Sequence, residues 1–279
     1  MDYVFRALSD DEFPAWRTFA ARSGALPTAW PSFYLACRAS FSPELRAFVL
    51  LREGAFCAVL TLEVSARGVI GRTARAPHNE HHPYYSLAWD HEPETARQLG
   101  RALAEEFDVV SFERVLLGDE LWELLDLQSG RSAEHILLPS THTADVSMQL
   151  VRPLERFRKE RSHRVHVTTR QKQRKLEKAG KLTFMASTDF DEPLFEECLK
   201  IETLGWKARE GVPILSDPKA AMFYRTLARE AAVDGTYCLY QIRLDDRLIA
   251  YGITLRAGRR ADVLKISFHP DSAPLSPGS

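Results

Sequence analysis

Lysine is missing from the first 150 residues of this 279-residue chain, which carry 13 Arg and 21 Asp and Glu. The remaining residues carry 24 Lys and Arg against 17 Asp and Glu. Such an abrupt change of charge near the middle of a chain is typical of two units with different roles. We expect an anionic ligand to favour the second, basic unit.

Long apolar runs and clustered cysteines are missing too. No run approaches the roughly 20 apolar residues that a membrane-spanning helix needs, and the first residues, MDYVFRALSDDEF, lack the basic-then-apolar order of a signal peptide. The cysteines Cys37, Cys57, Cys198 and Cys238 are isolated among apolar neighbours. We therefore expect a cytoplasmic protein with reduced cysteines in its core.

Recognisable metal and nucleophile motifs are absent as well. The segment HNEHH, residues 78–82, lies in a stretch with Asn and Pro that is typical of a loop. A loop does not fix the spacing that two histidines have on a helical HExxH site, so we predict no metal site. No Ser/His/Asp or Cys/His set is visible as a motif.

The sequence does contain one order of elements twice. In the first half, Ser9 and Glu12 form a capping box before a helix, and Glu53-Gly54 turns an apolar hairpin. YVFRALS is the first strand, and a second helix precedes the hairpin. YYSLAW reads as the fourth strand, and helix, strand, helix and strand follow. The prediction is β-α-α-β-β-β-α-β-α-β.

The second half repeats the first six of these elements. LTFMAS is a strand, residues 193–204 form a helix, and Asp217 with Pro218 begins another. A hairpin turned at Asp245-Asp246 and the strand RADVLKISF complete the order β-α-α-β-β-β.

Linked segments of the second half resemble a known family. RQKQRKLEKAGKLTF, IETLGWKAREG and DDRLIAYGITLRAGRRADVLKISFHPDSAPLSPG are similar to the acyltransferase domain of the CelD/BcsL family, associated with cellulose and other exopolysaccharide synthesis. The element order is that of the GNAT acetyltransferase fold, duplicated as in Fem-type transferases. The resemblance implies an α/β fold with mixed sheets: a degenerate GNAT-like domain (1–150), a basic connecting helix (151–181) and a second GNAT-like domain (182–279). Family members continue past SPG, so we expect this domain to be cut short after its fourth strand.

The resemblance implies an acyl-CoA co-substrate, either acetyl-CoA or another acyl-CoA. Its pyrophosphate is held in this fold by the amides that open the helix after the fourth strand. If RADVLKISF is that strand, the phosphate turn consists of Ser276, Pro277, Gly278 and Ser279, although Ser-Pro-Gly also suits an ordinary surface turn. The matching position of the first half, DHEPETA, holds three carboxylates, which would repel a nucleotide.

Five further residues are candidates for the acceptor side and the chemistry. The resemblance places Trp206 and Lys207 near the acceptor, where a ring and an ammonium suit a sugar or an anionic group; a core Trp beside a solvated Lys fits as well. A charge in an apolar strand is costly unless it is paired or faces a cleft, so we predict a ligand contact for Lys265. The candidates for a general base are Asp262 and His269, and both also fit as loop residues.

Residues 152–181 carry 12 Lys and Arg against three Glu. These cations could contact nucleic-acid phosphates, but Phe157 is the one aromatic residue available for stacking. A solvated connecting helix is favoured over a nucleic-acid site. The 3′-phosphate of CoA, an anionic polysaccharide precursor and a membrane surface stay open as ligands.

The resulting hypothesis is acyl-CoA-dependent N- or O-acyl transfer to a small acceptor, such as a sugar or a surface-polysaccharide precursor, by the complete protein. Two alternatives stay open. One is a non-catalytic scaffold or binding protein with a remnant GNAT fold, which would form oligomers through an open strand edge. The other is a Fem-like transferase that uses aminoacyl-tRNA.

Overall fold

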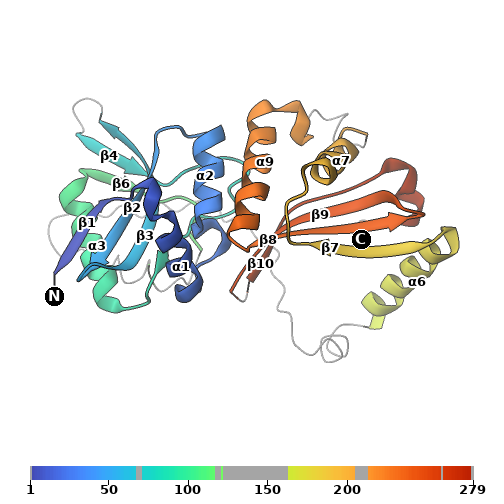
Figure 1. The fold of residues 1–279 in the computed structure, drawn as a ribbon, viewed down its shortest axis with the longest axis horizontal. Coiled ribbons are helices and arrows are strands. Elements are labelled where there is room, and N and C mark those ends of the chain that lie inside the picture. Colours follow the sequence, from blue (N-terminus) through green and yellow to red (C-terminus); the bar gives the residue numbers. More distant parts are fainter. Residues whose placement is uncertain are drawn as a thin grey trace.

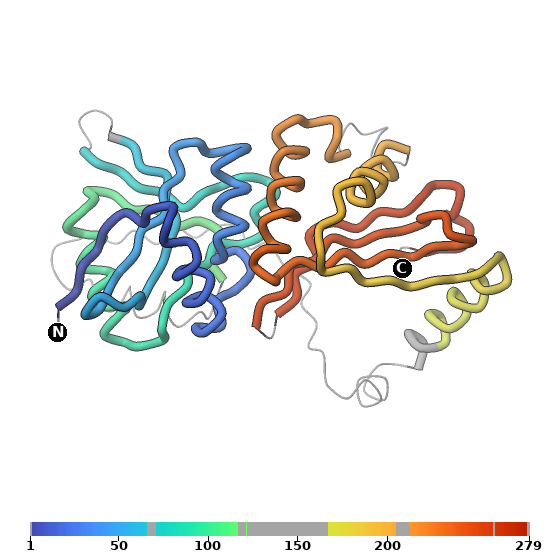
Figure 2. The backbone as a smooth tube through the Cα atoms, in the orientation of Figure 1, coloured from blue at the N-terminus to red at the C-terminus, as the bar shows by residue number. Residues whose placement is uncertain are grey.

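The strands of the molecule form two separate sheets, one from each half of the chain (Figure 1). The computed structural model describes residues 2–66, 71–116, 121, 163–204, 213–258 and 260–277. The two halves lie side by side, and the helices α2 (Pro31–Ser40) and α9 (Pro218–Val233) run next to each other between the sheets (Figures 1 and 2). In the described ranges, no helix combines the length and apolarity needed to cross a membrane.

The first half contains a sheet in the order β1-β2-β3-β4-β6, with β5 paired to β3. Besides α2, its elements are β1 (Tyr3–Ala7), α1 (Phe13–Ser23), β2 (Leu45–Arg52), β3 (Ala55–Ala66), β4 (Arg72–Arg75), β5 (Ala88–Trp89), α3 (Pro93–Glu106) and β6 (Val109–Ser111). The capping box is present, with a short 3₁₀ turn before α1. The hairpin turn is confirmed, since Glu53 and Gly54 have φ angles of 51° and 80°.

The prediction for the first half was wrong at two strands. It omitted β4, a strand of four residues in which only Ala74 is buried, too short for an alternating pattern to stand out. It also extended a strand over YYSLAW, of which Ala88–Trp89 pairs with β3 as β5 and Tyr85 forms an isolated bridge with Val115. The two tyrosines before β5 are buried instead, and their hydroxyls bond to Asp262 and to the carbonyl of Thr61.

The predicted elements of the second half are confirmed. They are β7 (Leu182–Ser187), α7 (Glu192–Glu202), α9, β8 (Tyr237–Leu244), β9 (Arg247–Ala257) and β10 (Arg260–Phe268). The helix α6 (His163–Ala179) lies within the range of the predicted basic connecting helix, and the 3₁₀ helix η5 (Pro270–Leu275), which was not predicted, follows β10. The strands form an antiparallel sheet in the order β10-β9-β8-β7. Asp217 caps α9 by accepting a hydrogen bond from Lys219 N at 2.8 Å. The predicted domain boundary near residue 150 lies outside the described residues.

Strand β10 lies at the edge of the second sheet. It pairs with β9, and in the described part of the chain no strand pairs with its other side. The register shifts between Val263 and Lys265, so Leu264 is the extra residue of a β-bulge. Val263 and Ile266 are 63% and 56% exposed. The edge strand of this sheet therefore carries a bulge beside Lys265.

A hydrophobic core extends across both halves and fixes one against the other. At its centre, Phe223 of α9 is fully buried, and its ring lies 5.5 Å from the ring of Phe33 and 5.6 Å from that of Phe41. The four cysteines are buried and unpaired, as predicted, and burial raises the pKa of the Cys37 and Cys198 thiols to about 12. Thiols with such pKa values stay protonated and behave as core residues.

A buried ion pair adds to this junction. The side chain of Asp234 is completely buried, and its carboxylate accepts hydrogen bonds from Arg17 Nε at 2.6 Å and Ser32 N at 2.9 Å. We expect Arg17→Ala to lower the free energy of unfolding by about 2 kcal/mol, less than for a fully buried pair because Arg17 is 24% exposed. Urea denaturation measures this difference. Arg97→Ala, which removes an exposed helical pair with Glu94, should have a much smaller effect; equal effects would contradict the prediction.

Candidate functional site

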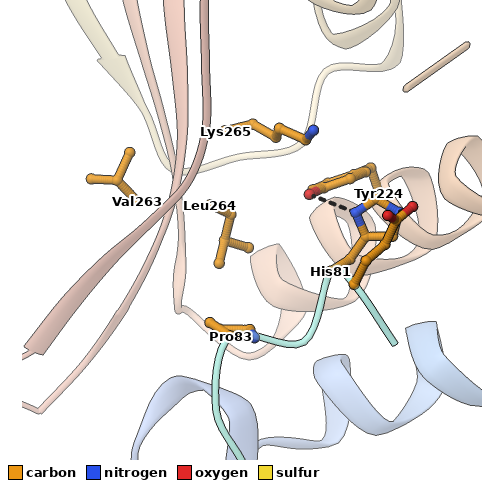
Figure 3. Close-up of a pocket in the computed structure, with 7 residues that line it drawn as sticks. His81, Pro83, Tyr224, Val263, Leu264 and Lys265 are labelled. Carbon is orange, nitrogen blue, oxygen red and sulfur yellow. Dashed lines mark hydrogen bonds and ion pairs between the residues drawn. The ribbon is translucent and has the colours of Figure 1, made fainter. Parts of the chain in front are cut away.

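A cavity of about 180 Å³ lies where the bulge of β10 meets the first half (Figure 3). Both halves line it, the first through the loop before β5 and the second through α9 and β10. The lining residues are Glu80, His81, Pro83, Tyr224, Val263, Leu264 and Lys265. The site is thus assembled only when the two halves are packed together.

Lys265, which the sequence analysis selects as a ligand contact, lines this cavity. Its side chain extends from β10 toward Tyr224 and His81 (Figure 3), and Nζ lies 5.7 Å from the centre of the Tyr224 ring. This distance is within the range of a cation–π contact. The positive charge of Lys265, which is unusual in an apolar strand, therefore lies at the cavity.

His81 is packed among aromatic rings at the wall of the cavity. The rings of Phe41 and Phe223 lie 5.6 Å and 5.8 Å away at small interplanar angles. Burial lowers the pKa of His81; Lys265 adds to this effect, and nearby carboxylates oppose it. With a pKa below the ordinary 6.5, the imidazole is neutral at pH 7 and offers one nitrogen lone pair.

Tyr224 connects His81 to the cavity. Its Oη lies 3.4 Å from His81 Nδ1 (Figure 3). Burial, aided by the negative charges of Glu202 and Glu80, raises the pKa of the phenol well above its usual range. The phenol therefore stays protonated at neutral pH and can donate a hydrogen bond.

One group of side chains around the cavity has the composition of a metal site. The ligand atoms of Glu80, His81 and Asp217 all lie within 4.8 Å of one another. The prediction of no metal site considered the histidine-rich loop alone. Asp217, at the start of α9, supplies a donor that lies far from this loop in the sequence.

Two of the three predicted catalytic residues lie elsewhere. Asp262 accepts hydrogen bonds from the hydroxyl of Tyr84 and from Arg260 Nε, and so joins β10 to the first half. His269 caps η5, where Nδ1 accepts a hydrogen bond from Asp271 N at 3.3 Å. Neither lines the cavity, because Asp262 is engaged at the contact with the first half and His269 at the start of η5.

The predicted phosphate turn is described only in part. Ser276 ends η5 with a φ of 53°, and Pro277 is buried. This end of the chain lies beside α6, whose Lys175 Nζ donates a hydrogen bond to Pro274 O. Gly278 and Ser279, and the predicted acceptor residues Trp206 and Lys207, lie outside the described residues. Their roles stay predictions.

The three carboxylates of the first half that are expected to repel CoA lie at the start of α3. Glu92 is its N-cap residue, and Glu94 lies in its first turn and pairs with Arg97 at 2.6 Å. Asp90 lies 3.1 Å from Arg52. Negative charge therefore gathers at a helix N-terminus that it stabilises.

His81, Tyr224 and Asp217 were not predicted from the sequence as site residues. The only sequence signal for His81 was the high density of histidine in HNEHH. The sequence did not show which residues from elsewhere in the chain would lie beside it. Tyr224 lies on the apolar side of a predicted helix and Asp217 is a good N-cap, so both have sufficient structural explanations. Only the contact between the halves brings the three together.

Comparison with known proteins agrees with this architecture. Residues 159–279 match the family model of the acetyltransferase (GNAT) domain. The crystal structure of FemX is similar to this chain, with 11% identity and a TM-score of 0.59. The similarity covers 100% of this chain and 83% of the FemX chain. The C-terminal domain (DUF2156) of a protein described as a lysylphosphatidylglycerol synthetase from Agrobacterium fabrum is similar over 95% of this chain and 70% of its own, with 13% identity and a TM-score of 0.51.

At these identities, the structural likeness shows the fold alone. Because the likeness to FemX extends over both halves, the predicted fold class, mixed α/β with GNAT-like halves, is confirmed. No curated protein sequence matches the chain.

Proposed function

We propose that this protein is a GNAT-type acyltransferase that moves an acyl group from acyl-CoA to an amine or hydroxyl of a small acceptor held between its halves. The observation that carries the proposal is the position of the cavity. It opens beside the bulge of β10, in the segment that matches the GNAT domain, and its opposite wall comes from the first half.

The edge of β10 suits the donor. The amide groups of an extended pantetheine arm can bond to peptide groups of a strand, as an added strand does. Leu264 has no partner residue on β9, so the ladder is interrupted beside Lys265. An acyl thioester that follows this edge would reach the cavity at the bulge.

Two side chains supply the chemistry. Acyl-CoA brings a thioester whose carbonyl carbon accepts the nucleophile and whose thiol leaves. The Lys265 ammonium would stabilise the negative charge that grows on the carbonyl oxygen while the new bond forms. The Tyr224 phenol would donate its proton to the departing sulfur as the C–S bond breaks and regain a proton from the acceptor nitrogen or oxygen. The net result is one proton moved from the acceptor to the thiol.

The acceptor lies between groups of both signs, since Glu80 and Lys265 line the cavity together. A polar molecule with hydroxyl or amine groups fits such a lining. The resemblance to the CelD/BcsL family supports a sugar or a surface-polysaccharide precursor, made in the cytoplasm where acyl-CoA is available.

Thermal unfolding with added ligands tests the proposal. At a concentration of 100 times Kd, acetyl-CoA or octanoyl-CoA is expected to stabilise the chain by about 2.7 kcal/mol, and free thiol should appear when an amino sugar is added. The absence of stabilisation by either acyl-CoA would contradict the proposal. Stabilisation by aminoacyl-tRNA instead would favour the Fem-like alternative, and binding without thiol release for any acceptor would favour the scaffold.

A further inference from the structure

The carboxylates of Glu80 and Asp217 and the imidazole of His81 meet from two distant parts of the chain. Their ligand atoms lie within 4.8 Å of one another. Glu80 and His81 belong to a loop of the first half, and Asp217 is the residue before α9 in the second. We propose that these three side chains bind one Zn²⁺ ion across the junction of the halves.

The donor set suits zinc. Zn²⁺ takes imidazole nitrogen and carboxylate oxygen together, and sites with three protein ligands leave one position for water or another ligand. Imidazole favours zinc and the other transition metals over Mg²⁺ and Ca²⁺, which prefer oxygen alone.

His81 provides independent support for a ligand here. Its side chain is only 10% exposed. Nε2 is buried and makes no hydrogen bond among the described residues. Glu80 Oε1 lies 3.4 Å from Nε2, which is an ion-pair distance when the imidazole is protonated. A buried nitrogen that points at a carboxylate and has no hydrogen-bond partner is rare in folded proteins. A metal ion between the two groups would satisfy both.

The other ring nitrogen has the partner that a metal-binding histidine needs. Nδ1 lies 3.4 Å from the hydroxyl oxygen of Tyr224. When Nδ1–H donates to this oxygen, the Nε2 lone pair points toward Glu80, and the phenolic proton of Tyr224 is free to face the cavity. The zinc site and the proposed use of Tyr224 as a proton donor are therefore compatible, and each can fail without the other.

Asp217 is held in place by the helix that it caps. One of its oxygens, Oδ1, accepts the hydrogen bond from Lys219 N. This bond does not engage Oδ2 and fixes the direction in which the carboxylate faces. A ligand oxygen oriented in this way is typical of metal sites.

The local charge also favours a cation. The carboxylates of Glu80, Asp217 and Glu202 place negative charge near His81. The Lys265 ammonium places positive charge near it. Three negative charges against one positive charge leave the position attractive to a divalent ion.

Calorimetric titration of the full chain with ZnCl₂, after chelator treatment, tests the site. We expect one ion per chain, and Co²⁺ in its place should give the visible absorption of a bound, low-symmetry ion. Glu80→Gln, His81→Gln and Asp217→Asn should each weaken binding at least tenfold, and Tyr224→Phe about tenfold. Asn caps helices as well as Asp does, so Asp217→Asn keeps the start of α9 intact. Glu80, with 80% of its side chain exposed, can be changed without loss of folding.

The matched control is His78→Ala. This histidine belongs to the same loop, is 45% exposed and pairs with Glu113 at 3.1 Å, so its loss should leave zinc affinity unchanged. Absence of binding up to millimolar zinc would overturn the proposal. Two further results would overturn it, since the ion would then lie on the loop alone. One is the same zinc affinity in Asp217→Asn as in the unaltered chain. The other is a loss of zinc affinity in His78→Ala as large as that in His81→Gln.

Discussion

Replacement of Lys265 by alanine is expected to lower the kcat of acyl transfer by about 10²- to 10³-fold, the usual effect of removing one group that stabilises an oxyanion. Lys265 lies at the bulge of β10 and lines the cavity, where the thioester oxygen would acquire negative charge. Without the ammonium, this charge would develop next to the Tyr224 ring. The rate of thiol release at saturating acceptor measures the effect.

Lys265→Arg and Lys200→Ala complete this experiment. Arginine keeps the charge but places it differently, so Lys265→Arg should recover part of the rate. Lys200 lies on the exposed side of α7, and its removal should leave kcat unchanged. If Lys265→Ala raised KM and left kcat intact, the ammonium would bind a substrate and take no part in the chemical step.

Lys265 also shows how much of the site a sequence pattern can predict. Burial of an unpaired charge is costly, so a lysine inside the apolar strand DVLKISF is expected to face a cleft or a partner. This argument was sufficient to select Lys265. The second half was predictable for similar local reasons. Asp217-Pro218 marks the start of a helix, and Asp245-Asp246 forms a tight turn with positive φ at both positions, 49° and 66°.

The opposite wall of the cavity could not be predicted from local patterns. Tyr224 and His81 are separated by 143 positions in the sequence, and their contact depends on how α9 packs against the first half. The same reason explains the general-base candidates. Asp262 was selected because it lies near the strand, but a tyrosine from the first half, 178 positions away, occupies its carboxylate. No periodicity within either segment records such a partner.

Packing between the halves leads to the largest expected effect on stability. Phe223→Ala should lower the free energy of unfolding by about 3–5 kcal/mol, the range for loss of a fully buried phenylalanine. Phe223 is 0% exposed, and its ring lies 5.5 Å from Phe33, 5.8 Å from His81 and 5.2 Å from Tyr224. Residues of both halves therefore lose contacts at once. Urea denaturation, followed by tryptophan fluorescence and by circular dichroism, measures the change.

Met222 provides the control, because it precedes Phe223 on the same helix and is 50% exposed. Met222→Ala should change stability by no more than about 0.5 kcal/mol. Since the core is continuous across the junction, we expect the unaltered chain to unfold in one transition that both probes report together. Phe223→Ala should shift that transition to lower urea without dividing it. A loss below about 1 kcal/mol, or separate unfolding of the halves in the unaltered chain, would mean that the junction contributes little to folding, and that the cavity between the halves is not a fixed site.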